Sequence, residues 1–223
     1  ESRGVECQTQ PPQFFVDFIQ NHDQTGNRAQ GERLISLAGA DKTRVLLAAL
    51  LLSPHIPLLF MGEEFGETHP FLFFTDFHGE LAKAVREGRA KEFSGHAGHD
   101  ETVPDPNDVN TFIRSKLDWN KIATDEGKTW LRYTRHLLTL RHRYIVPLLH
   151  PGGAVEGHVL KTAPGMVAVS WRFPSGTLSL ALNIGTKPVD LPALAGETRF
   201  AWPELNDVLP PNGIVVRFAD GEA

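Results

Sequence analysis

Polar side chains that could bind a sugar follow two short apolar runs of the sequence. The run Phe14–Gln20 leads into Asn21-His22-Asp23-Gln24-Thr25-Gly26-Asn27-Arg28, and the run Ile56–Met61 leads into Gly62-Glu63-Glu64-Phe65-Gly66-Glu67. Each sugar hydroxyl needs both hydrogen-bond donors and acceptors, which acids, amides and a histidine supply together. The two polar segments therefore indicate a site for a polyhydroxylated ligand. Ordinary solvated loops would account for either segment on its own.

The elements around these segments predict how they are positioned. The apolar stretch Val45–Leu52 is followed by Ser53 and Pro54, which predicts a buried helix that ends before the proline. The aromatic and β-branched runs on either side of it predict strands. Strand, helix and strand in this order are typical of a βαβ unit with parallel strands. Ligands collect at the carboxyl ends of such strands, where the polar segments begin.

The character of the chain changes near Pro147. Before it, Ala82–Glu92 and the stretch 125–143 are expected to be helices, the second with Thr124 as its N-cap. After it come short β-rich runs, punctuated by turn residues: Val155–Lys161, Met166–Phe173, Leu178–Asn183 and Ile214–Phe218. We therefore predict two domains, an α/β part at residues 1–147 and an antiparallel β-module at residues 148–223.

Some side chains are expected to be structural. Four arginines of the second helix should lie on its solvated face, while Trp130, Leu137 and Leu138 pack inward. These arginines are Arg132, Arg135, Arg141 and Arg143. Four aromatic side chains are expected in the core, with stacking on sugar rings in a cleft as the alternative. They are Phe71, Phe73, Phe74 and Trp119.

Composition excludes several classes of function. The net charge is −5, which does not indicate a nucleic-acid or anionic-membrane surface, and the single Cys7 excludes a disulfide framework. No P-loop, G-x-G-x-x-G or G-x-S-x-G motif is present. The run Gly95–Asp100 holds two histidines, but it lacks the helical spacing of a zinc site. We expect no metal, no cofactor, no membrane span and no export signal, and therefore a cytoplasmic location.

Five ordered stretches resemble the alpha-amylase superfamily of glycoside hydrolases. The first, Gln20–Arg28 with Gly31-Glu32-Arg33-Leu34, is similar to the fourth signature region of that superfamily, in the form found in malto-oligosyltrehalose trehalohydrolases. The second, Ser53–Gly66, is similar to the last barrel strand of these enzymes. The remaining three fit this subfamily more narrowly: Pro70–Phe77, Val85–Arg89, and Val103–Pro106 leading to Thr111-Phe112. The resemblance is close over residues 13–145 and mainly architectural beyond them.

The resemblance implies a fold, an activity and a site. The fold would be the C-terminal part of a (β/α)8 TIM barrel followed by a small antiparallel β-sandwich. The activity would be hydrolysis of the α-1,4-glucosidic bond next to the terminal trehalose of maltooligosyltrehalose, which releases trehalose. Asp23 matches the carboxylate that stabilises the transition state, and His22 would hold the same sugar. The segment from Gln24 through Thr25 and Gly26 to Asn27 would continue the substrate-binding loop.

The chain also departs from this family. A retaining glycosidase needs two further carboxylates, a nucleophile and a general acid/base, about 5–5.5 Å apart. In the superfamily they lie upstream of the Asn-His-Asp region, whereas only 22 residues precede Asp23 here. A full barrel takes about 250 residues. We therefore expect the chain to be a fragment that is inactive on its own.

Two other interpretations remain open. The chain could be a carbohydrate-binding or structural β-module with a vestigial barrel segment. It could also belong to another member of the superfamily, such as a glucan branching or debranching enzyme. The reaction products distinguish a branching or debranching enzyme from a trehalohydrolase, because only a trehalohydrolase releases trehalose.

Overall fold

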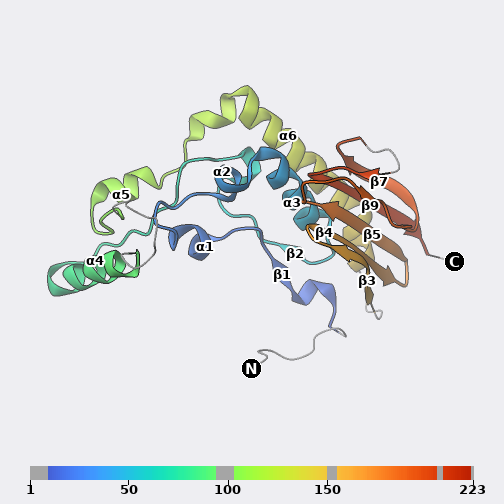
Figure 1. The fold of residues 1–223 in the computed structure, drawn as a ribbon, viewed down its shortest axis with the longest axis horizontal. Coiled ribbons are helices and arrows are strands. Elements are labelled where there is room, and N and C mark those ends of the chain that lie inside the picture. Colours follow the sequence, from blue (N-terminus) through green and yellow to red (C-terminus); the bar gives the residue numbers. More distant parts are fainter. Residues whose placement is uncertain (1–9, 94–102, 150–154, 205–207, 222–223) are drawn as a thin grey trace. The chain divides into compact units, whose positions relative to one another are not determined.

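The computed structural model describes residues 10–93, 103–149, 155–204 and 208–221, and it combines helices with strands (Figure 1). The predicted α/β class is confirmed. The chain divides into two compact units. The sheet unit comprises Glu1–Phe18, Ala40–Leu58 and Tyr133–Ala223, and the helical unit comprises Ile19–Gly39 and Leu59–Arg132. This division follows contacts and not chain order, so the predicted boundary between residues 147 and 148 stays a prediction.

A short parallel strand pair with a helical connection belongs to the sheet unit. A 3-10 turn, Pro12–Phe14, leads to β1 (Val16–Asp17), which pairs in parallel with β2 (Ile56–Pro57). The predicted βαβ pattern is therefore confirmed, but both strands are shorter than expected. The Ile56 and Leu58 N–H groups donate to the Phe15 and Asp17 carbonyls, at 2.9 and 2.8 Å, so Pro57 stands at a position whose N–H this ladder does not use.

The helix between these strands is α3 (Ala40–Leu52). It ends where predicted, because the residue before Pro54 is disfavoured in the helical region. Four of its five leucines are almost fully buried, as their apolar run predicted: Leu47, Leu50, Leu51 and Leu52. On one side α3 packs against β5 and β9 of the large sheet described below.

The large sheet is antiparallel, with strand order β3-β4-β5-β9-β7. Its strands are β3 (Glu156–Ala163), β4 (Met166–Phe173), β5 (Gly176–Asn183), β7 (Glu197–Trp202) and β9 (Gly213–Asp220). A second antiparallel pair joins β6 (Val189–Asp190) to β8 (Val208–Leu209). All four predicted β-rich runs are strands, whereas β6, β7 and β8 were not predicted.

Both faces of this sheet are apolar. One face carries a buried cluster from β4, β5 and β9 that also includes Leu194 and Leu209. On the other face Leu178 and Val216 line a small cavity together with Leu52 of α3. The central strand β5 is therefore buried on both sides, as is typical of a strand that lies between two apolar layers.

The helix α6 spans Asp125–Leu140 and continues as a π-helical turn, Arg141–Ile145, and a 3-10 turn, Val146–Leu149. Its predicted N-cap is confirmed, because the Thr124 hydroxyl accepts a hydrogen bond of 3.0 Å from the Gly127 N–H.

The prediction that Arg141 is solvated is wrong. Arg135 and Arg143 are exposed, as expected, but only 7% of Arg141 is exposed. Its guanidinium donates hydrogen bonds to the carbonyls of Leu51, Ser53 and His55, at 3.0, 2.6 and 2.6 Å. The last carbonyls of a helix have no partner within the helix, so Arg141 satisfies one carbonyl of the last turn of α3, that of Leu51, and two just beyond its end.

The helical unit consists of short helices and extended connections. Its helices are α1 (His22–Gly26), α2 (Leu34–Ala38), α4 (Gly79–Phe93) and α5 (Val109–Arg114), with 3-10 turns at Glu63–Phe65 and Trp119–Ala123. The predicted helix Ala82–Glu92 corresponds to α4. The polar segment after β1, expected as a loop, is instead partly helical. Asn21 explains this difference, because its side chain accepts a hydrogen bond of 2.9 Å from the Gln24 N–H and caps α1.

Buried polar side chains hold the extended connections of the helical unit together. The Glu67 carboxylate accepts hydrogen bonds from the backbone N–H groups of Thr68, His69 and Asp118, at 2.7, 2.8 and 2.7 Å. The Arg33 side chain is fully buried and donates to the carbonyls of Met61 and His69, at 2.7 and 2.6 Å. Charged groups thus replace a sheet ladder as partners for these backbone groups.

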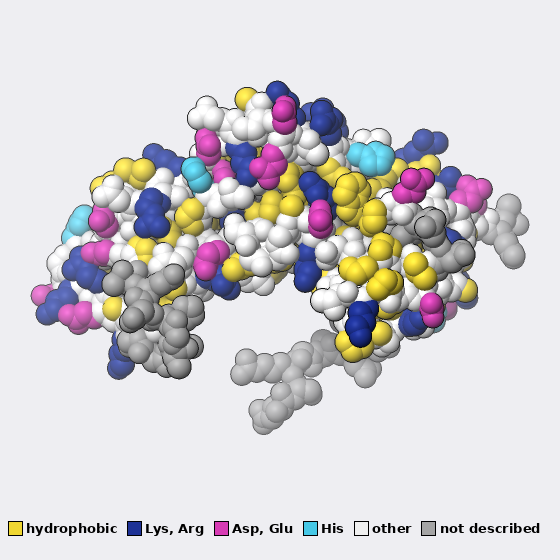
Figure 2. Space-filling view, turned by 45° about the horizontal axis from the view of Figure 1, so that its top comes forward, with side chains coloured by type: hydrophobic (Ala, Val, Ile, Leu, Met, Phe, Trp, Pro, Cys, Tyr) yellow, Lys and Arg dark blue, Asp and Glu magenta, His cyan; other side chains and the backbone are white. Residues whose placement is uncertain are grey.

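On the face shown in Figure 2, basic and acidic side chains are interspersed. No helix among the described residues is long and apolar enough to cross a membrane.

Candidate active site

The side chains of His22 and Asp23 stand on the first turn of α1. They are 70% and 72% exposed, and His22 Nε2 lies 3.3 Å from Asp23 Oδ1. The Asn21 cap fixes the backbone just before them. Asp23 therefore offers carboxylate oxygens to a ligand in solution, with an imidazole beside it that can donate or accept a hydrogen bond.

The other predicted substrate-binding residues divide into two groups. Gln24 and Asn27 are exposed, like His22 and Asp23. Thr25 and Gly26 are buried, so the structure favours a packing role for them. A Cβ atom at Gly26 would lie in ordinary van der Waals contact with the Phe71 ring, 3.6 Å away.

The residue before α1 is part of a buried hydrogen-bond network. Gln20 is 5% exposed, its amide donates to Glu63 Oε1 at 2.9 Å, and its carbonyl oxygen accepts from the Leu34 N–H at 2.9 Å. The Phe60 N–H donates to Glu63 Oε2, also at 2.9 Å. In this network Gln20, the residue before the first polar segment, meets Glu63 of the second polar segment below the surface.

Glu63 is therefore a supporting residue of the site. Burial raises the pKa of Glu63 to about 7, against the hydrogen bonds from Phe60 and Gln20 and the charge of Arg33, which lower it. Burial likewise lowers the pKa of Arg33, while the charges of Glu67, Glu63 and Glu64 raise it. Glu63 and Arg33 thus belong to a group of buried, partly compensated charges in the helical unit.

Arg89 connects α4 to the end of α1. One guanidinium nitrogen donates to the carbonyls of Gly26 and Arg28, at 2.7 and 3.1 Å, and another pairs with Glu92 at 2.9 Å. The guanidinium also lies over the rings of Phe73 and Phe93, 5.0 and 4.6 Å from their centroids. Only 7% of Arg89 is exposed, so it fixes the end of α1 from inside the helical unit.

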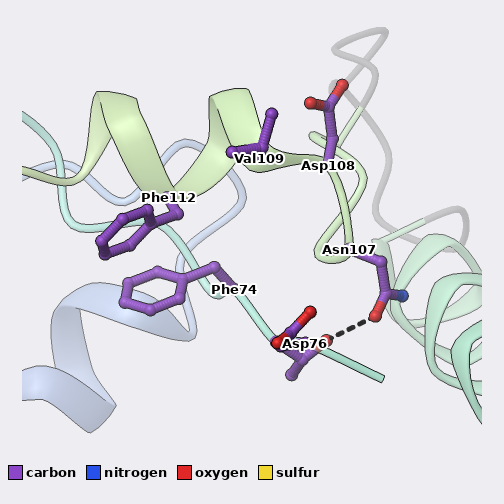
Figure 3. Close-up of a pocket in the computed structure, with 7 residues that line it drawn as sticks. Phe74, Asp76, Asn107, Asp108, Val109 and Phe112 are labelled. Carbon is purple, nitrogen blue, oxygen red and sulfur yellow. Dashed lines mark hydrogen bonds between the residues drawn. The ribbon is translucent and has the colours of Figure 1, made fainter. Parts of the chain in front are cut away.

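A pocket of about 540 Å³ lies in the same unit (Figure 3). Its lining residues are Phe74, Thr75, Asp76, Asn107, Asp108, Val109 and Phe112. The expectation that Phe74 belongs to the core is wrong, because its ring lines this pocket. Phe73 is 38% exposed and Trp119 is 65% exposed, so they are not core residues either.

Sequence reasoning missed the roles of Arg89, Asp76 and Phe112. Each of them lies in one of the stretches that resemble the trehalohydrolases, and this position was the one indication of a role that the sequence offered. The contacts of Arg89 and Phe112, and the pocket that Asp76 lines, join segments far apart in the chain, so neither periodicity nor local spacing could reveal them.

The described residues hold no cluster of three or more His, Cys, Asp or Glu side chains placed to bind a metal ion. The histidine-containing run Gly95–Asp100, considered above as a metal site, lies outside those residues.

Comparison with known proteins decides the relationship. The chain is 49% identical over 137 residues to malto-oligosyltrehalose trehalohydrolase of Deinococcus radiodurans, covering 61% of this chain and 22% of the relative. It is 38% identical over 197 residues to the enzyme of the same name from Brevibacterium helvolum, covering 87% of this chain and 32% of the relative. The chain is related to one segment of the malto-oligosyltrehalose trehalohydrolases. It spans about a fifth to a third of the length of these relatives.

Solved structures share the fold of this chain. A Salmonella typhimurium protein named as a candidate alpha amylase is 65% identical, with a TM-score of 0.92 over 97% of this chain and 37% of that chain. Isomaltulose synthase of Erwinia rhapontici has a TM-score of 0.60 over 93% of this chain and 43% of that chain, at 15% identity, and thus shares the fold alone. No protein-family model matches the chain.

Proposed function

We propose that the chain is the C-terminal part of a glycoside hydrolase that releases trehalose from maltooligosyltrehalose by cleaving the adjacent α-1,4-glucosidic bond. The observation that carries this proposal is the exposed His22–Asp23 pair on a capped helix, which is held from below by Gln20 and Arg89. The shared name of the curated relatives, which are 33–49% identical, supports the substrate.

Asp23 would act on the sugar next to the scissile bond. Its carboxylate accepts hydrogen bonds from ring hydroxyls, and these bonds strengthen as positive charge develops on the sugar in the transition state. A charged acceptor forms stronger hydrogen bonds than a neutral one. His22, Gln24 and Asn27 would hold the same sugar from the exposed side of α1.

The nucleophile and the general acid/base of a retaining mechanism would come from a part of the enzyme outside this chain. Glu63 and Glu67 are buried and already accept hydrogen bonds from protein groups, so neither is exposed to a substrate. We therefore expect the 223-residue chain to release no trehalose on its own.

The parallel pair β1 and β2 would be the end of a (β/α)8 barrel, with the large sheet as a C-terminal β-sandwich domain. Apolar side chains on and beside these two strands are exposed: Phe14 by 70%, Val16 by 55%, Ile56 by 42% and Leu58 by 47%. Parallel strands are normally covered on both faces. Further strands and helices of the barrel would cover these side chains.

Substitution of Asp23 tests the proposal. In the full-length polypeptide that contains this chain, Asp23→Asn should lower kcat for trehalose release by about a hundredfold or more, because a neutral amide stabilises positive charge poorly. The fold should survive, because Asp23 is 72% exposed. Asp41→Asn is a matched control, since Asp41 is 68% exposed and also has a single basic neighbour, Arg44. Near-normal turnover by Asp23→Asn would remove Asp23 from the site.

Two alternatives make other predictions. A glucan branching or debranching enzyme would use the same carboxylate but release no trehalose. A carbohydrate-binding β-module is less well supported, because Phe173 and Phe200 are 5% and 8% exposed and serve as core residues. No cofactor is proposed, and a cytoplasmic location stays a prediction.

A further inference from the structure

The pocket in the helical unit has an aromatic wall at one end. The rings of Phe74 and Phe112 lie 5.2 Å apart, centroid to centroid, and are inclined by 63°. Figure 3 shows them side by side, with Asp76 and Asn107 at the other end of the pocket. Phe112 is 43% exposed, so a ligand could pack directly on it.

The polar side chains of the pocket differ in whether they are free to form hydrogen bonds with a ligand. The Asn107 side chain is already engaged by protein groups. Its Oδ1 accepts hydrogen bonds from Thr75 Oγ1 and the Phe77 N–H, at 3.0 and 3.2 Å, and its Nδ2 donates to the Ala82 carbonyl at 3.1 Å. Asp108 caps α5 by accepting from the Asn110 N–H at 2.8 Å.

Asp76, in contrast, is exposed and has no hydrogen-bond or ion-pair partner within the part of the chain that the structure describes. Its carboxylate is the group left to receive hydrogen bonds from a ligand.

These features fit a hexose ring. The C–H face of a sugar packs against aromatic side chains, while its hydroxyls donate to carboxylate oxygens. A volume of about 540 Å³ is also typical of small-molecule sites. Asp76 and Asp108 disfavour an anionic ligand, because both are acidic.

The pocket lies near α1, in the same unit as the proposed active site. A Cβ atom at Gly26 of α1 would lie 3.6 Å from the Phe71 ring, and the Phe71 N–H donates to the Gly31 carbonyl at 2.8 Å. The next ring, that of Phe74, is 5.7 Å from Phe71 and already lines the pocket. One aromatic ring therefore separates the pocket from the helix that carries Asp23.

We propose that this pocket is a distal subsite for the glucan chain of the substrate, in which Phe112 packs against a glucosyl ring and Asp76 accepts its hydroxyls. This inference rests on the proposed function, because it assigns to the pocket another part of the same oligosaccharide. A distal subsite makes turnover depend on the length of the glucan chain.

The experiment compares substrates of two lengths on the full-length polypeptide. For maltopentaosyltrehalose, Phe112→Ala and Asp76→Asn should each raise KM about three- to tenfold with kcat nearly unchanged. For maltosyltrehalose, which is too short to reach a distal subsite, both constants should stay at their normal values. Ile113→Ala is the matched control, since Ile113 is also on α5 and 51% exposed but does not line the pocket.

Equal effects on both substrates, or no effect on either, would overturn the proposal. So would a loss of thermal stability in Phe112→Ala with unchanged kinetics, because the pocket would then be a packing surface. If the normal polypeptide released no trehalose, the proposed function would fail first. Calorimetric titration of this chain with maltoheptaose then tests the pocket separately: binding that is weakened by Phe112→Ala but not by Ile113→Ala supports it, and absence of binding contradicts it.

Discussion

Burial makes Glu63 a much weaker acid than an exposed glutamate. Its pKa is raised from 4.5 to about 7, so the folded protein holds a proton that the unfolded chain has already lost between these pH values. The free energy of unfolding should therefore fall as pH rises from about 4.5 to about 7, and this destabilisation is complete above that window.

Glu63→Gln should remove this pH dependence. The amide has the same shape and no charge, so the variant should become more stable relative to the unmodified chain as pH rises, by about 3 kcal/mol in total. Urea unfolding of both proteins, at a pH below the window and at one above it, measures the difference. Glu80→Gln is the control, because Glu80 is an exposed residue of α4. A difference that does not grow with pH would contradict the assignment.

At the scale of single residues, the sequence predicted which side chains could bind a sugar but not which of them reach the surface. His22 and Asp23 are exposed, as their proposed role needs. The neighbouring Thr25 is buried, because the Asn21 cap turns this segment into a helix with one inward face. In Glu63-Glu64, Gly62 at φ 87° starts a tight turn, and this turn buries Glu63. The amino-acid composition does not indicate which of the two glutamates is buried.

Between elements, Arg89 of α4 should set the position of α1. Arg89→Ala removes the hydrogen bonds to the Gly26 and Arg28 carbonyls, so α1 and Asp23 should lose their alignment with the substrate. In the full-length polypeptide we expect kcat for trehalose release to fall about ten- to a hundredfold, with a smaller change in KM.

Arg89→Lys should recover part of this kcat, because lysine keeps the charge and can donate to one carbonyl. Lys83→Ala is the control, since it removes a positive charge from an exposed position of the same helix. If Arg89→Ala lowered the melting temperature but left kcat unchanged, the side chain would be structural only.

A second arginine holds the end of α3. Arg141→Met should lower the free energy of unfolding by about 2–4 kcal/mol, because the carbonyls of Leu51, Ser53 and His55 lose a charged donor. Chemical denaturation of the chain measures this loss. Arg135→Met, at an exposed position of α6, should cost about 0.5 kcal/mol or less. Similar losses in the two variants would contradict the role of Arg141.

Helices and strands whose ends are set by nearby residues could be predicted from the sequence. Elements that depend on contacts with residues far away in the chain could not. Pro54 and the apolar run before it predicted the end of α3, and Thr124 predicted the start of α6. The strand β7 has little local signal and forms because it pairs with β9. Arg141 was misplaced for the same reason, because its partners lie about ninety residues earlier in the chain.

At the scale of the whole molecule, the five ordered stretches that resemble trehalohydrolases predicted more than composition or periodicity could. The curated relatives confirm that relationship at 33–49% identity. The chain, however, covers only about a fifth to a third of the relatives' length. The proposed activity therefore rests on the exposed Asp23 carboxylate and the residues that support it, and we propose that the rest of the barrel and the two remaining carboxylates lie outside this chain.

The most direct test of the account is a product analysis. The full-length polypeptide that contains this chain is incubated with maltotriosyltrehalose, and the sugars are separated and quantified. The account predicts trehalose and maltotriose in equal amounts, and no trehalose from the 223-residue chain alone. Turnover that yields branched or shortened glucans without free trehalose would contradict it, as would trehalose release by the isolated chain.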